Sequence, residues 1–145
     1  MDTPKKDLSY FSLRLKDLLN TSFPEKAHDQ KFIEHRASLA ANVYEGAFQS
    51  GNDVEKCNEI ANYILFEGLH FSKFDTVFEV VCNEFDTVMA DEELRLFALK
   101  MFPICKPIFD GYELTDDFAY NTDFDLLYTE LTGTIALWIE ENGLQ

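Results

Sequence analysis

The sequence has little of the residues that mark several common classes of protein. Its three cysteines, Cys57, Cys82 and Cys105, are widely spaced and form no Cys-x-x-Cys pair. This pattern argues against a disulfide scaffold or a zinc ribbon and indicates free thiols in a reducing compartment. No apolar run approaches the ~20 residues that span a bilayer, and charged residues interrupt the N-terminal run that a signal peptide requires. We therefore expect a cytoplasmic protein without a membrane segment.

Signals for β-structure and for internal repeats are also absent from the sequence. There is no hairpin signal, no sustained alternation of apolar and polar residues, and no low-complexity linker. The chain has 145 residues, the size of one ordinary domain. We predict a single all-α domain over residues 1–145, irregular in arrangement, with about six helices and no sheet.

Helical periodicity is the strongest positive signal, and it is clearest over residues 72–88. Gly68 ends the helix before this stretch, and Ser72 is the expected N-cap. Further helices are expected over residues 8–20, 29–50, 53–67, 90–102 and 122–142. The central stretch predicts one buried seam of about five turns, formed by Phe74, Val77, Phe78, Val81, Phe85 and Val88.

The part of the chain after residue 102 is less regular. Pro103 and Pro107 are expected to bracket a short, broken segment, because proline interrupts helical hydrogen bonding. Residues 110–122 are interpreted as a loop that packs its aromatic side chains over the core. Thr122 is the expected cap of the last helix.

The charge is the most unusual feature of the composition. The chain has 12 Lys and Arg against 27 Asp and Glu, a net charge of −15. Residues 107–145 hold nine acidic residues and no Lys, Arg or His. Such a surface repels nucleic-acid phosphate and anionic lipid and favours basic partners. The alternative interpretation is that the charge only keeps a Phe-rich protein soluble.

The residues that carry chemistry form no recognisable catalytic or metal-binding pattern. His28, His35 and His70 belong to no metal-binding or catalytic motif, so neither catalytic residues, nor a metal, nor a cofactor is assigned. An alternation of Asn121, Asp123 and Asp125 lacks the glycine and the final glutamate of a calcium loop. The Gly68 corner could precede a DNA recognition helix, but that helix is acidic, so we expect no direct binding of nucleic acid.

Three stretches together resemble a bacterial family. They are Gly68-Leu69-His70-Phe71-Ser72, Asn83-Glu84-Phe85, and Asp116-Asp117-Phe118-Ala119-Tyr120 followed by Tyr128-Thr129-Glu130-Leu131-Thr132-Gly133. The chain resembles domain-of-unknown-function family eighteen-ninety-six, small acidic proteins often encoded near mobile genetic elements. The resemblance implies an all-helical cytoplasmic domain and brings no catalytic residues with it.

The leading hypothesis is a non-catalytic protein-interaction domain with an acidic C-terminal face that binds a basic protein. The partner-binding residues are predicted to be Asp110, Glu113, Asp116, Asp117, Asp123 and Asp125, with Tyr112, Phe118 and Tyr120 as aromatic anchors. One alternative is an acidic mimic of nucleic acid that modulates a DNA-processing protein of a mobile element. Another is a small enzyme with an acid–base pair and a deep pocket at His70. Homodimerisation through Leu13, Leu126 or Leu137 also stays open.

Overall fold

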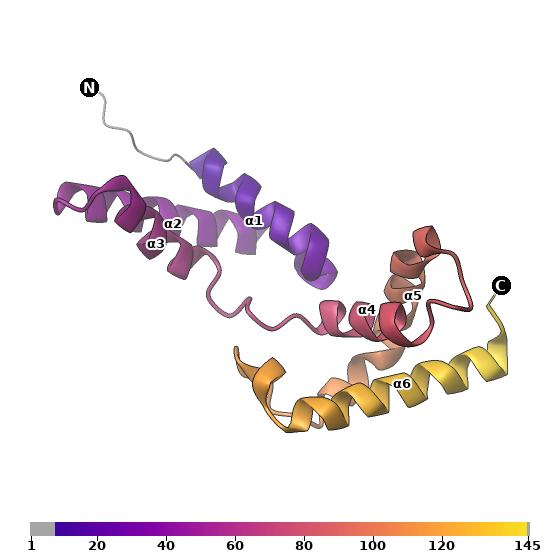
Figure 1. Ribbon diagram of the computed structural model, residues 1–145. Helices are drawn as coiled ribbons and strands as arrows, with labels where there is room; N and C mark the ends of the chain where they lie inside the picture. The colour runs from indigo at the N-terminus through magenta and orange to yellow at the C-terminus, as the bar shows by residue number, and fades with distance from the viewer. Residues whose placement is uncertain (1–7, 145) are drawn as a thin grey trace. The chain divides into compact units, whose positions relative to one another are not determined.

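The computed structural model describes residues 8–144 (Figure 1). These residues form six α-helices and two short 3-10 helices, and no strand occurs among them. The predicted all-α class is confirmed. The helices are α1 (Leu8–Ser22), α2 (Gln30–Gln49), α3 (Val54–Leu65), α4 (Lys73–Glu84), α5 (Asp91–Phe109) and α6 (Asp123–Asn142), with η1 at Pro24–Lys26 and η2 at Phe118–Tyr120.

The helices gather into two compact units, one ending at His70 and the other beginning at Phe71. We call them the N-terminal unit and the C-terminal unit. Each has a hydrophobic core of its own. A single domain over residues 1–145 therefore stays a prediction, which cooperative unfolding of the two units would support.

The N-terminal unit packs α1 and α3 against α2. Alanines at positions 37 and 40 of α2 are fully buried, and their small side chains let neighbouring helices approach closely. Tyr44 and Ile33 complete the buried face of α2. Phe11, Leu15 and Leu19 of α1 and Cys57, Ala61 and Leu65 of α3 fill the rest of this core.

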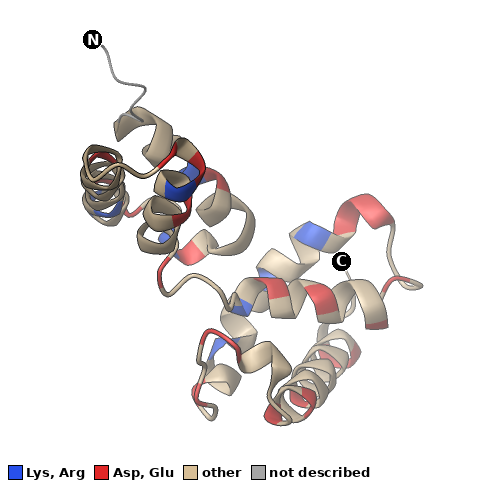
Figure 2. Cartoon of the chain, turned by 60° about the vertical axis from the view of Figure 1, so that its left-hand side comes forward, with Lys and Arg blue, Asp and Glu red and all other residues tan. Residues whose placement is uncertain are grey.

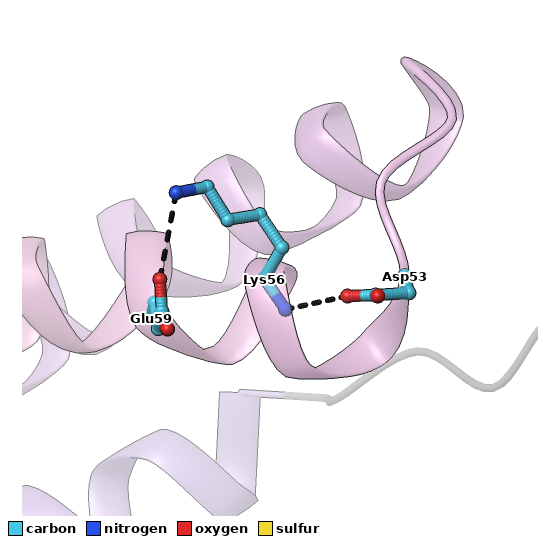
Figure 3. Close-up of polar contacts among 3 residues, drawn as sticks. All are labelled: Asp53, Lys56 and Glu59. Atoms are coloured by element: carbon cyan, nitrogen blue, oxygen red, sulfur yellow. Dashed lines mark hydrogen bonds and ion pairs between the residues drawn. The ribbon is translucent and has the colours of Figure 1, made fainter.

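The helix caps of this unit follow the sequence signals. Asp29 accepts a hydrogen bond from the amide of Phe32, and Asp53 accepts one from the amide of Lys56 at 2.8 Å. Figure 3 shows Lys56 between Asp53 and Glu59, with its ammonium nitrogen 3.5 Å from the Glu59 carboxylate. Gly51, with φ of +97°, ends the α2 segment as predicted, because glycine adopts positive φ without steric cost.

Arg36 of α2 hydrogen-bonds to backbone carbonyls at the C-terminal end of α3. Its guanidinium donates to the backbone oxygen of Glu67 at 2.7 Å and to those of Leu65 and Ile64 at 3.3 and 3.4 Å. The last carbonyls of a helix have no partner within the helix, so a cation there satisfies them and opposes the negative end of the dipole. The same guanidinium lies 4.8 Å from the ring centroid of Phe32.

The C-terminal unit is built around α4, which begins where the sequence predicts and ends earlier than predicted. Ser72 caps it as expected, accepting from the amide of Asp75 at 2.9 Å. The helix ends at Glu84, however, one turn before Val88, which is 50% exposed. Val88 is therefore not part of the core seam, because the chain has already left the helix and turns toward α5.

The structure corrects the interpretation of Pro103 and Pro107, since α5 continues through both prolines to Phe109. The two rings are four residues apart and exposed, so they lie on the solvent side of the helix. Cys105 and Phe109, on the opposite side, are buried. Burial of that face outweighs the hydrogen bonds that the two prolines remove.

The segment from residue 110 to 122 contains η2 and leads into α6. The hydroxyl of Thr122 makes no capping hydrogen bond; Asn121 accepts from the amide of Asp123 at 2.8 Å instead. The predicted last helix is present, and its residues Leu127, Leu131 and Ile135 are fully buried. No helix in the described part of the chain is long and apolar enough to cross a membrane.

Candidate interaction surface

The predicted acidic residues come from the end of α5, the loop that follows it, and the first turn of α6. Their side chains are all exposed. Asp110 follows the last residue of α5, where negative charge is unfavourable to the helix dipole, so helix stability does not explain it. Six carboxylates thus lie within sixteen residues of chain. We call Asp110, Glu113, Asp116, Asp117, Asp123 and Asp125 the acidic loop surface.

The acidic loop surface belongs to a unit with few cations. From residue 71 to 145 the sequence holds four Lys or Arg and sixteen Asp or Glu, a net charge of −12. Figure 2 shows acidic positions along α4, at the start of α5 and along α6. No ion pair joins the acidic residues after position 107 to a Lys or Arg within residues 8–144. Their charge is therefore not neutralised by pairing there.

Three of the four cations in this unit lie over aromatic rings. The guanidinium of Arg95 is 4.9 Å from the ring centroid of Phe74, and the ammonium of Lys100 is 4.9 Å from that of Trp138. The ammonium of Lys106 lies 5.2 Å from the Phe102 centroid. These contacts are attractive because the ring face carries partial negative charge. The contacts keep these three charged groups against aromatic rings, and the acidic loop surface stays strongly negative.

The three predicted aromatic anchors have different surroundings. Phe118 is 1% exposed and packs against Tyr112, Phe71 and Phe124, with centroids 5.8, 5.3 and 6.3 Å away. It is a core residue and cannot contact a partner, which corrects its assignment as an anchor. Tyr120 is 92% exposed, so the expectation that it packs over the core was wrong. Within η2, the side chain of Phe118 therefore points inward and that of Tyr120 points outward.

Tyr112 is half-buried and held in place by a carboxylate. Its hydroxyl donates a hydrogen bond to Glu130 of α6. This bond, together with burial and the charges of Glu130 and Asp123, raises the pKa of Tyr112 to about 12. The hydroxyl is thus a fixed donor that ties the acidic loop to α6. Sequence reasoning missed Glu130, since contact between residues eighteen apart leaves no local signal.

The three histidines, including His70 of the enzyme alternative, are exposed. His28 precedes α2, His35 lies on α2, and His70 lies in the segment between α3 and α4. Within the described residues, no group of three or more His, Cys, Asp or Glu side chains could hold a metal ion. Cys57 and Cys105 are buried, and burial raises the pKa of the Cys105 thiol to about 11, which makes it a poor nucleophile.

Sequence reasoning also missed exposed apolar side chains near the start of α5. α5 carries apolar residues on several sides, yet Leu96 is 69% exposed. Val88 and Leu144 are exposed as well, and they line the same hollow as Leu96. The apolar content of α5 gave no indication of which side remains uncovered. The C-terminal unit therefore has a second candidate surface in addition to the acidic loop surface.

These features define an all-helical, strongly acidic class of protein whose unusual surfaces lie on the C-terminal unit. Comparison with known proteins gives the particular family. The family model described as "Domain of unknown function (DUF1896)" matches residues 3–144, and the chain belongs to this family, as the sequence resemblance predicted.

A solved structure supports the fold. The crystal structure of protein PG0816 from Porphyromonas gingivalis is 36% identical in sequence and superposes with a TM-score of 0.87. The alignment covers 95% of this chain and 94% of that one. No curated protein matches the chain. The fold and the family are thus established, while the family description names no activity.

Proposed function

We propose that this protein is a non-catalytic, cytoplasmic protein-interaction domain that binds a basic protein through the acidic loop surface. The observation that carries the proposal is the unpaired charge of that surface. Its carboxylates are exposed and make no ion pair with a described Lys or Arg, while three cations of the same unit lie over aromatic rings. The buried thiols of Cys57 and Cys105 agree with a reducing compartment.

Physical reasoning favours recognition by charge at this surface. Like-charged carboxylates close together repel one another, and a basic partner relieves that repulsion on binding. Complementary charge also accelerates encounter and excludes acidic partners. Tyr120 adds an amphipathic side chain that is 92% exposed among the carboxylates, of the kind enriched at binding hot spots. The surface thus combines electrostatic attraction with an apolar contact.

Affinity capture from a native lysate tests the proposal. The unmodified chain is compared with the triple variant D110N/E113Q/D116N. In the unmodified chain, none of these three carboxylates makes a described hydrogen bond. The matched control is E34Q/E55Q/E67Q, which removes the same number of exposed charges from the N-terminal unit. A fourth protein, Tyr120→Ser, removes the exposed ring and leaves every charge in place.

We expect a basic protein that is retained by the unmodified chain and by the control, and released by the triple variant or by high salt. Salt acts because ~0.15 M ions screen exposed charges beyond about 8 Å. Equal retention by the triple variant and the control would refute the acidic loop surface as the site. Displacement of the retained protein by duplex DNA would identify the chain as a nucleic-acid mimic.

A further inference from the structure

A second surface of the C-terminal unit contains a small apolar pocket. Its walls come from the turn between α4 and α5, the first three turns of α5, and the segment after α6, which lie close together in Figure 1. The pocket measures about 240 Å³. We call it the terminal pocket; it is lined by Val88, Met89, Glu93, Leu96, Phe97, Lys100 and Leu144.

The size and exposure of the terminal pocket suit a side chain from another molecule. Small-molecule sites usually measure ~300–1,000 Å³, so this pocket is smaller than most of them. Leu96, Val88 and Leu144 are 69%, 50% and 42% exposed, and each loses contact with water when an apolar group enters. The fit is to one large apolar side chain that a partner protein presents.

Acidic residues lie in the wall of the terminal pocket and close in sequence to its other walls. Glu93 is part of its wall, and further exposed carboxylates lie within a few residues of the walls along the chain. Lys100 is the one cation among the pocket walls, and its ammonium lies over Trp138. The carboxylates are Asp86, Asp91, Glu92, Glu93, Glu140 and Glu141.

We propose that the terminal pocket binds a partner segment that carries one large apolar side chain flanked by Lys or Arg. The apolar side chain enters between Leu96, Val88 and Leu144, and the flanking cations face these carboxylates. Charge selects a basic segment over an acidic one. The apolar side chain supplies most of the affinity, because charge pairs at an exposed rim contribute little. This surface is separate from the acidic loop surface, which lies at the opposite ends of α5 and α6.

Trp138 provides a direct measurement, since it is the single tryptophan of the chain. Its ring lies 6.0 Å from that of Phe97 and beneath Lys100, and both of these residues line the pocket. Three synthetic peptides without Trp or Tyr are titrated while Trp138 emission is recorded. One has a central Leu among Lys residues, the second has Ser in place of Leu, and the third has Glu in place of Lys.

We expect saturable binding of the Leu–Lys peptide. The other two peptides should bind with an affinity at least about tenfold lower. Leu96→Gln weakens binding of the Leu–Lys peptide by about tenfold. Leu144→Gln also weakens binding, and it leaves the core intact because Leu144 lies after α6 and is 42% exposed. Leu126→Gln, which changes a leucine that is 60% exposed outside the pocket, binds like the unmodified chain.

The proposal is overturned if the Ser peptide binds as tightly as the Leu peptide, or if Leu96→Gln binds like Leu126→Gln. It is also overturned if Trp138 emission changes with protein concentration alone, which would mean that a second copy fills the pocket. The variant D110N/E113Q/D116N is expected to bind the Leu–Lys peptide normally. Failure of the acidic loop surface in the lysate experiment would therefore leave the terminal pocket unaffected, and the reverse also holds.

Discussion

Replacing Arg36 by methionine should destabilise the N-terminal unit measurably. The substitution keeps an apolar side chain of similar length over Phe32 and removes the donor to the end of α3. Of the three carbonyls that Arg36 contacts, only that of Glu67, at 2.7 Å, has the distance of a strong hydrogen bond. The contacts to Leu65 and Ile64, at 3.3 and 3.4 Å, are at the long end of the range.

The expected loss follows from that geometry. A hydrogen bond to a charged group contributes ~1.5–3 kcal/mol to stability. Arg36 is half-buried, so water replaces part of the lost bond, and we expect the low end of that range, about 1.5 kcal/mol. For a chain of this length the melting temperature should fall by roughly 3–6 °C. Backbone amides around residues 64–67 should also exchange with solvent faster.

Urea unfolding followed by circular dichroism measures the free-energy difference. The matched control is Lys31→Met, which removes one exposed positive charge from the same helix away from the end of α3. Arg36→Lys keeps the charge without the planar fork and should lose about half as much stability. If Arg36→Met lies within about 0.5 kcal/mol of Lys31→Met, the carbonyl contacts do not stabilise α3, and the reasoning is refuted.

Three further predictions test other parts of the structure. The raised pKa of Tyr112, about 12, means that its neutral hydroxyl stabilises the fold fully below pH ~10 and loses that effect between about pH 10 and 12. In an ultraviolet titration, Glu130→Gln should lower the pKa of Tyr112 toward ~10. An unchanged transition would contradict the hydrogen bond between Tyr112 and Glu130. Pro103→Ala should raise the free energy of unfolding by about 1 kcal/mol, because it restores an amide that can bond the Leu99 carbonyl on the exposed side of α5; a decrease would show that the ring is packed. If residues 1–145 fold as one domain, Trp138 fluorescence and far-ultraviolet circular dichroism should give coincident urea transitions, whereas separate midpoints would mean that the units unfold independently.

Most helix positions were predictable because their signals are local. Asp29, Asp53 and Ser72 precede apolar residues at helical spacing, and each accepts a hydrogen bond from the amide three residues later. Gly51 and Gly143 adopt the positive φ that their positions after a helix predict. The position of α6 could be derived in the same way. Capping and periodicity depend on neighbours within one or two turns, which a sequence displays directly.

The candidate surfaces were only partly predictable. Exposure of the charged residues after position 107 follows from the cost of burying unpaired carboxylates, and their side chains are indeed exposed. The aromatic residues among them gave no such guide. Phe118 and Tyr120 are two residues apart in similar surroundings, yet one is 1% and the other 92% exposed. Phe118 points inward because Phe71, Tyr112 and Phe124 pack around it, and none of these three lies at a regular helical spacing from it.

By itself the sequence determined the helical class, most caps, the family and the concentration of negative charge toward the C-terminus. Tertiary structure alone decided the division into two cores, the passage of α5 through Pro103 and Pro107, and the exposure of Leu96 beside Val88 and Leu144. The reason is the range of the forces involved. Periodicity shows which side of a helix is apolar, but a helix that is apolar on several sides leaves some of them uncovered, and long-range packing decides which.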